Sequence, residues 1–227
     1  MIEREEGIFM KIIKKYGFFI MITVIISELT FPFVFANFYP DYDPITMLIS
    51  DFGEDGSPIK TVFKIWQLID GGLFLLTIPS FYERFKHTSK PLAKWLSIMM
   101  AGFAIGDCVI TGIFDRSTNT TKINVESIIH DYLSGLGFVA LLIAVYILTK
   151  LYNLEKEQLV VQLFLIIFLL SICFMLLFAA PKIPIINQVR IPYRGLWQRL
   201  NLLFLYLPFF LVSLKSIHWK NKKDQSR

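Results

Sequence analysis

Three carboxylates lie inside apolar stretches of this chain: Glu28, Asp70 and Asp107. A charge at such a position costs about 3 kcal/mol unless it is paired or lines a wet cavity. Like charges and desolvation both disfavour the ionised form, so at least one of the three is expected to be protonated at neutral pH unless Lys64, Arg199 or a cation compensates. Such groups can act as general acid or base or carry a proton. The alternative is a buried hydrogen-bonded network that fixes helix packing.

Other polar residues recur at helical spacing near the same ends of their apolar stretches. Each set would form one face of a helix, so the faces can meet in a bundle. The sets are Lys60, Lys64, Gln67 and Gly71; Asp107, Thr111 and Asp115; Ser127, His130, Ser134 and Gly137; and Arg194, Gln198 and Asn201, with Arg199 beside them.

The composition requires that these residues be positioned by membrane helices. Hydrophobic residues make up 55% of the 227 residues and charged residues only 18%, with a mean hydropathy of +0.56. A span needs about 20 mainly apolar residues. The predicted fold is therefore all-α, a bundle of six transmembrane helices that forms one domain over residues 1–227. The helices are expected over 17–35, 58–80, 92–114, 127–150, 158–180 and 195–214.

The lysines and arginines predict the orientation of this bundle. With both termini in the cytoplasm, fifteen of the 23 basic residues fall on the inner side and eight on the outer side, as the positive-inside rule requires. The protein is thus expected in the cell membrane, with a cytoplasmic N-terminus over 1–16 and a basic cytoplasmic tail over 215–227. Topology and attraction to membrane lipid account for the net charge of +5, so nucleic-acid binding is not indicated.

His130 is the one histidine placed at the outer side, because His87 and His218 fall in cytoplasmic segments. A three-histidine zinc centre is therefore unavailable. One histidine with carboxylates could still hold a metal, but no metal ligand is assigned. His130 can be a general base or a hydrogen-bonded residue at a helix start. A Ser50, Asp51 and His130 arrangement can be drawn, but no Gly-x-Ser-x-Gly elbow supports a serine nucleophile.

The first outer loop, residues 36–57, is expected to contain a short interfacial helix. Asp43 can cap a helix that Pro44 opens and Gly53 ends. The residues Ile45, Leu48, Ile49 and Phe52 then fall on one side of a helix over Asp43 to Phe52, turned toward the membrane or the bundle. The alternative is a loop that only tethers two spans.

Several short motifs resemble one family of membrane proteins. Residues 39–44 (YPDYDP) and 49–53 (ISDFG) are similar to the YP-x-Y-x-P and ISDLG opening of the domain-of-unknown-function 998 family. Residues 112–114 (GIF), 129–130 (IH) and 195–199 (GLWQR) resemble its later motifs, although Asp115 stands where the family often has proline. The resemblance implies six spans and no particular activity or cofactor. It singles out Ser50, Asp51, His130, Gln198 and Arg199, all at outer ends of spans.

Two functions from different classes follow. The first is an enzyme at the outer leaflet that acts on lipid or envelope precursors. There His130 would be the base, Asp51 or Asp107 the acid, and Arg199 a holder of phosphate or carboxylate, with Ser50, Glu28, Asp70 and Gln198 contacting the ligand. The second is a proton- or cation-coupled transporter or a membrane sensor that uses Glu28, Asp70 and Asp107. The candidate residues cluster near the outer ends of the spans, and this favours a site that opens only to the extracytoplasmic side.

Overall fold

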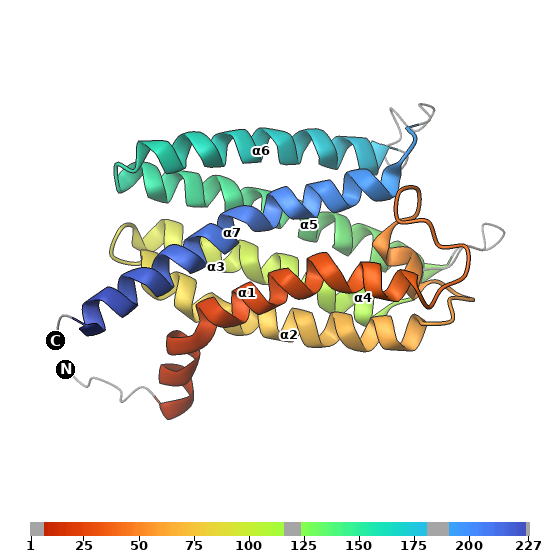
Figure 1. Cartoon of the computed structure of the whole chain (residues 1–227), viewed down its shortest axis with the longest axis horizontal. Coiled ribbons are helices and arrows are strands. Elements are labelled where there is room, and N and C mark those ends of the chain that lie inside the picture. Colours follow the sequence, from red (N-terminus) through yellow and green to blue (C-terminus); the bar gives the residue numbers. More distant parts are fainter. Residues whose placement is uncertain (1–6, 116–123, 181–190, 226–227) are drawn as a thin grey trace.

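The computed structural model of this chain describes residues 7–115, 124–180 and 191–225, and six of its helices are long and apolar enough to cross a membrane. In Figure 1, α1 begins and α7 ends at the same end of the bundle, here called the termini end. Residues 37–59, which join α1 to α2, lie at the opposite end, here called the loop end. No strand occurs among the described residues, so the predicted all-α bundle is confirmed.

The helices run in simple succession along the chain. They are α1 (Ile8–Ala36), η1 (Ile49–Gly53), α2 (Lys60–Phe85), α3 (Lys90–Phe103), η2 (Ala104–Val109), α4 (Ile110–Ile113), α5 (Val125–Leu154), α6 (Gln158–Ala179) and α7 (Arg194–Gln225). The third span, Lys90–Ile113, consists of α3, η2 and α4. Each predicted span coincides with one of the six long helices.

Side-chain caps set two of the helix starts. The Asn124 side chain accepts hydrogen bonds from the backbone N–H groups of Glu126 and Ser127, at 2.9 and 3.3 Å, which begins α5. Ser89 accepts from the N–H of Leu92, and Pro91 follows at the start of α3. Both caps satisfy amides that have no partner inside the helix.

The bundle packs around α2, α5 and α7. Helix α1 lies against α2 and α7, η2 lies between α2 and α5, and α6 covers α5 and α7. Only 22% of the apolar window of α6 is buried, against 50% for α5 and α7. The fifth span therefore lies at the periphery of the bundle.

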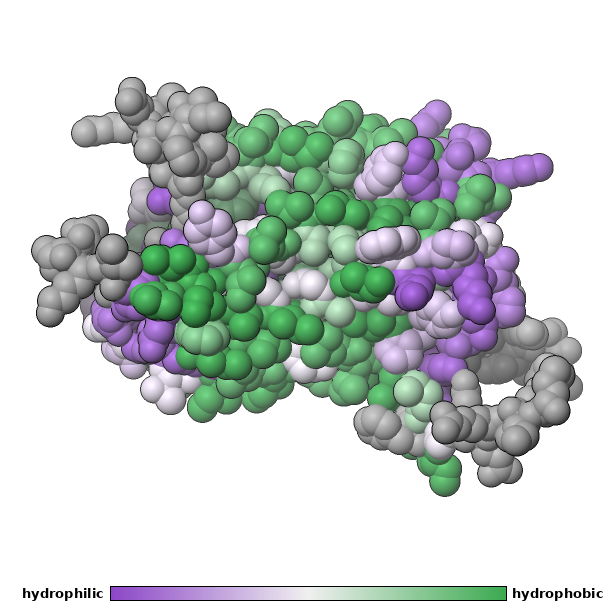
Figure 2. Space-filling model, turned by 180° about the vertical axis from the view of Figure 1, so that it is seen from behind, coloured by the Kyte–Doolittle hydropathy of each residue, from purple (hydrophilic) through white to green (hydrophobic). Residues whose placement is uncertain are grey.

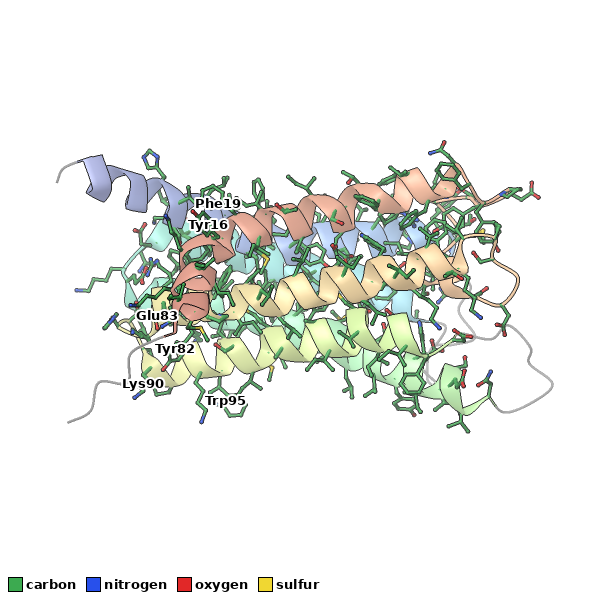
Figure 3. The ribbon with its side chains drawn as sticks, turned by 90° about the horizontal axis from the view of Figure 1, so that it is seen from below. Tyr16, Phe19, Tyr82, Glu83, Lys90 and Trp95 are labelled. Carbon is green, nitrogen blue, oxygen red and sulfur yellow. The ribbon has the colours of Figure 1, made fainter. Side chains whose placement is uncertain are left out.

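The surface has the distribution of polarity that a membrane-embedded bundle needs. Figure 2 shows apolar side chains over the middle of the molecule and hydrophilic ones toward both ends. At the termini end, the aromatic residues Tyr16, Tyr82 and Trp95 lie near Glu83 and Lys90 (Figure 3). Aromatic and charged side chains together are typical of the boundary between lipid and water.

The first loop contains a short helix, but not the continuous one expected over Asp43 to Phe52. Asp43 does cap a turn, since its carboxylate accepts from the N–H of Ile45 at 2.9 Å and from the Thr46 hydroxyl at 2.7 Å. The backbone is then extended at Leu48, and the 3-10 helix η1 follows.

The continuous helix fails because two amides bond elsewhere. The N–H of Leu48 donates to Asp51 Oδ2, and the N–H of Ile49 donates to Gln198 Oε1, each at 2.8 Å. Leu48, Ile49 and Phe52 are buried, whereas Ile45 is exposed. The loop thus folds over the bundle with three of its four predicted apolar residues inward.

Candidate functional site

Two buried carboxyls from neighbouring helices form the centre of the candidate site. Glu28 of α1 is 4% exposed and Asp70 of α2 is 3% exposed, so both carboxyls lie inside the bundle. The two side chains interact directly, and Asp107 and the Tyr206 hydroxyl also lie within range of Glu28. The thiol of Cys108 is 4.0 Å from Glu28 Oε1. Four helical segments therefore converge on Glu28.

Asp107 is presented by a local widening of its helix. The segment η2 is a π-helix, and such single-turn insertions recur at functional sites. The Ser134 hydroxyl of α5 donates to Asp107 Oδ1 at 2.5 Å, while the Thr111 hydroxyl donates to the Asp107 carbonyl oxygen. Sequence reasoning missed the π-helix, because its residues have the same apolar periodicity as the α-helix around them.

Glycines on the adjoining helices leave room for η2. A Cβ atom at Gly71 would lie 2.8 Å from Cys108 Cβ, and one at Gly137 would lie 2.8 Å from the Asp107 nitrogen. At Gly72, by contrast, a Cβ atom would meet no atom within 4 Å. Gly71 therefore permits the close approach of η2, whereas Gly72 does not take part in it.

Four of the predicted site residues meet at a small polar cavity of about 20 Å³. This volume holds about one water molecule. The cavity is lined by Glu28, Ser50, Asp107 and Gln198, together with Gln67, Thr111, Ser134 and four apolar residues. None of these described lining residues is a lysine, arginine or histidine, so the cavity offers carboxylate, amide and hydroxyl groups only.

A second, larger hollow lies between α1 and α7 beneath the first loop; we call it the α1/α7 groove. Its volume is about 310 Å³, and its walls are apolar apart from Glu28 and Arg199. The lining is Glu28, Leu29, Pro32 and Phe33 of α1; Pro44, Ile45 and Ile49 of the loop; and Leu196, Arg199, Leu200, Leu202 and Leu203 of α7. Phe33 is 52% and Leu203 40% exposed, so the groove borders the apolar surface. Glu28 lines both the groove and the polar cavity.

Arg199 fastens the first loop to α7. Its Nη1 donates to the carbonyl oxygens of Pro44, Met47 and Gly195 at 2.8, 3.0 and 3.1 Å, and its Nη2 donates to the Tyr42 hydroxyl at 2.7 Å. Its terminal nitrogens therefore contact neutral oxygens of the protein. This geometry supports a clamp rather than the expected holder of phosphate or carboxylate.

Tyr42 completes this clamp. Burial raises the pKa of Tyr42 to about 12, although Arg199 acts to lower it, so the hydroxyl keeps its proton at neutral pH. The hydroxyl donates to the carbonyl oxygen of Leu48 at 2.8 Å while it accepts from Arg199. The ring stacks on Phe52 with centroids 4.0 Å apart.

The remaining predicted residues do not join either hollow. His130 is buried at the start of α5, with its Nδ1 3.4 Å from Asp131 Oδ1. Asp51 uses a carboxylate oxygen to cap Leu48. His130, Asp51 and Asp70 line neither the polar cavity nor the groove. The arrangement of Ser50, Asp51 and His130 as a catalytic set thus has no geometric support.

An ion-pair cluster at the loop end was not anticipated. Asp115 lies 2.6 Å from Lys60 Nζ and 2.5 Å from Lys64 Nζ, and Lys60 also contacts Asp55 at 2.8 Å. Lys64 was considered as a counter-charge for the interior carboxylates, but here it pairs with Asp115. The sequence does contain a sign of this cluster. Lys60 and Lys64 share one face at the start of the second span, and Asp115 follows the end of the third span, so the three residues lie at the same end of the bundle.

Asp115 makes the stability of this cluster depend on pH. Partial burial acts to raise the pKa of Asp115, but hydrogen bonds and charge from Lys60 and Lys64 outweigh it and hold the pKa below its usual range. A carboxyl whose folded pKa is depressed stabilises the fold above its unfolded pKa, about 3.9, and loses that contribution as the pH falls through the folded value.

We therefore expect Asp115→Asn to lower the free energy of unfolding at pH 7 by about 1 kcal/mol, since the pair is partly exposed. The difference from wild type should begin to shrink below about pH 4, the unfolded pKa, and vanish only below the folded pKa. Thermal unfolding midpoints in detergent at pH 7 and at pH 3 measure both. An equal loss at the two pH values would show that packing, not charge, is responsible.

Comparison with known proteins matches this chain to one protein family. No curated protein and no solved structure matches this chain. The sequence profile described as "Protein of unknown function (DUF998)" matches residues 24–215. That range runs from the middle of α1 into the last turns of the sixth span, and it includes every candidate site residue from Glu28 to Arg199. The chain therefore belongs to the DUF998 family, as its motifs predicted.

Proposed function

We propose that this protein is an integral membrane protein that binds a membrane lipid or lipid-linked amphiphile in the α1/α7 groove. The single observation that carries this proposal is the position of Glu28. It places a carboxyl at the wall shared by an apolar groove on the membrane-facing surface and a polar cavity in the interior. An apolar chain and its polar end would each find matching surroundings there.

The dimensions and chemistry of the groove support this occupant. Ligand sites are typically hollows of about 300–1,000 Å³ with apolar walls and few polar groups, and the groove has about 310 Å³ with Glu28 and Arg199 as its charged residues. Water would solvate leucine and phenylalanine walls poorly, whereas an acyl or alkyl chain packs against them. A single chain suits this volume better than a whole two-chain lipid.

The groove is expected to open toward the extracytoplasmic leaflet, because the basic residues favour cytoplasmic termini. A cysteine introduced at Asp55, in the first loop, should react with an impermeant maleimide added to intact cells. One introduced at Asn153, at the end of α5, should react only after lysis. Parental protein with its two natural cysteines, Cys108 and Cys173, provides the background. The reverse pattern would place the groove in the inner leaflet.

Filling the groove tests the function itself. Leu203→Trp places a larger side chain in the groove, whereas Ile166→Trp makes a similar change on the exposed face of α6, away from it. We expect wild type and Ile166→Trp to retain lipid through purification in mild detergent, and Leu203→Trp to lose most of it. Native mass spectrometry measures the bound lipid per protein.

Equal lipid retention by all three proteins would contradict the proposal. Loss from both tryptophan variants would indicate a general effect of surface change, so a shared loss would also count against a groove site. Comparison of their unfolding midpoints controls for damage to the fold.

Coupling of a proton or cation is a second candidate function. It is favoured by the direct interaction of Glu28 with Asp70 inside the bundle, where carboxyls are costly unless they bind a partner. In vesicles with an internal pH dye, such a protein would move protons when a substrate is added, and Asp70→Asn would abolish the movement.

A further inference from the structure

Glu28, at the wall of the groove, and its buried neighbour Asp70 form no ion pair with a lysine or arginine among the described residues of the loop end. Lys60 and Lys64 are paired with Asp115. Arg194 donates to the carbonyl oxygen of Phe178, and Arg199 donates to the first loop. Glu28 and Asp70 therefore lie together in the bundle without a neutralising cation from these residues.

Two further polar side chains, Asp70 and Tyr206, lie beside Glu28 in the interior of the bundle. Asp70 Oδ2 and the Tyr206 hydroxyl are buried and make no hydrogen bond of normal geometry within the described chain, although both side chains interact with Glu28. Both side chains are neighbours of Glu28. Buried polar atoms without partners are uncommon and cost about 1–3 kcal/mol each. When Asp70 is ionised, this oxygen can only accept, so the partner that it lacks is a donor.

We propose that the polar end of the amphiphile is a protonated amine that binds Glu28. The proposal rests on the function proposed above and adds the chemical class of the ligand. An ammonium has three donors and no acceptor, which suits Glu28 at the wall of the groove, with Asp70 behind it. Its alkyl chain would pack against Leu29, Leu200 and Leu203.

The same geometry disfavours a phosphate or carboxylate end group. An anion would meet Glu28 and Asp70 in a setting of low dielectric, where like charges repel strongly. Arg199 keeps its positive charge, but four hydrogen bonds hold its terminal nitrogens at the first loop and at Gly195. The groups that act most strongly on Glu28 are instead Asp70, Asp107 and Tyr206. The charge of the end group should therefore decide which of several amphiphiles with the same alkyl chain binds most tightly.

Three probes with the same alkyl chain test the inference: dodecylamine, dodecanol and dodecyl phosphate. Each is titrated into purified protein in mild detergent at pH 7, and apparent affinity is taken from the rise of the unfolding midpoint. In wild type we expect dodecylamine to bind about tenfold more tightly than either other probe, the ratio that one charge-assisted hydrogen bond supplies.

Two substitutions locate the effect. Glu28→Gln keeps the shape of the side chain and should bring the amine to within about twofold of the alcohol. Asp115→Asn removes one negative charge from the ion-pair cluster outside the groove, so it should leave the preference intact. Leu203→Trp keeps every carboxyl and should weaken binding of all three probes.

The outcomes separate the inference from the function beneath it. If dodecanol or dodecyl phosphate binds wild type as tightly as dodecylamine, and Leu203→Trp weakens all of them, the amine is wrong and the groove proposal stands. A preference for the amine that survives Glu28→Gln also overturns the inference. If no probe binds and wild type retains no more lipid than Leu203→Trp, the proposed function itself fails.

Discussion

Gly137→Ala will destabilise the bundle by about 1–3 kcal/mol, the usual cost of an added methyl group in a packed interior. A Cβ atom at this position would lie 2.8 Å from the Asp107 backbone nitrogen and 3.1 Å from Asp107 Cβ. Neither atom belongs to the flexible end of a side chain, so η2 must shift away from α5. The hydrogen bond from Ser134 to Asp107 would lengthen with it.

Gly135→Ala is the matched control, two residues earlier in α5. A Cβ atom there would meet no atom within 4 Å. This variant should therefore be neutral or gain about 0.5–1 kcal/mol, because alanine loses less backbone entropy than glycine in a helix. Thermal or denaturant unfolding in detergent compares the two.

A second pair repeats the test on α2. Gly71→Ala would bring its Cβ to 2.8 Å from Cys108 Cβ, whereas Gly72→Ala meets open space. We expect a loss at position 71 and little change at position 72. Equal effects within each pair would mean that α2 and α5 are not packed closely against η2.

Arg199→Ala will lower the free energy of unfolding by about 2–4 kcal/mol, since it leaves several hydrogen-bond acceptors without their charged donor. The acceptors are the carbonyl oxygens of Pro44, Met47 and Gly195 and the hydroxyl of Tyr42. The first loop should detach from α7, and limited proteolysis should cut it earlier than in wild type.

Two further variants separate shape from charge at this clamp. Arg199→Lys should recover little stability, because one ammonium cannot reach acceptors that the planar guanidinium spans. Tyr42→Phe should cost less than Arg199→Ala, since the phenyl ring keeps its stacking on Phe52. If instead Arg199→Ala keeps full stability and loses bound lipid, Arg199 contacts the ligand, as the residue pattern first indicated.

The membrane architecture follows from local properties of the amino-acid sequence. Each span must satisfy its own backbone hydrogen bonds and present about 20 apolar residues, so the information for a span is local and continuous. The cost of a carboxyl in lipid likewise favours Asp70 inside the bundle, where it is found. The motifs around Tyr42 and Gln198 placed the chain in its family.

Which polar groups meet depends on how the helices and the first loop pack together in space. Gln198 accepts from the amide of Ile49 and Arg199 donates to Pro44, contacts between residues about 150 positions apart in the chain. These bonds divide the expected loop helix and turn Arg199 into a clamp. Lys64 likewise pairs with Asp115 rather than with the interior carboxylates. Helical spacing states which face a polar residue occupies, but its partner depends on how close the neighbouring helix comes, and small residues such as Gly71 and Gly137 set that distance through packing.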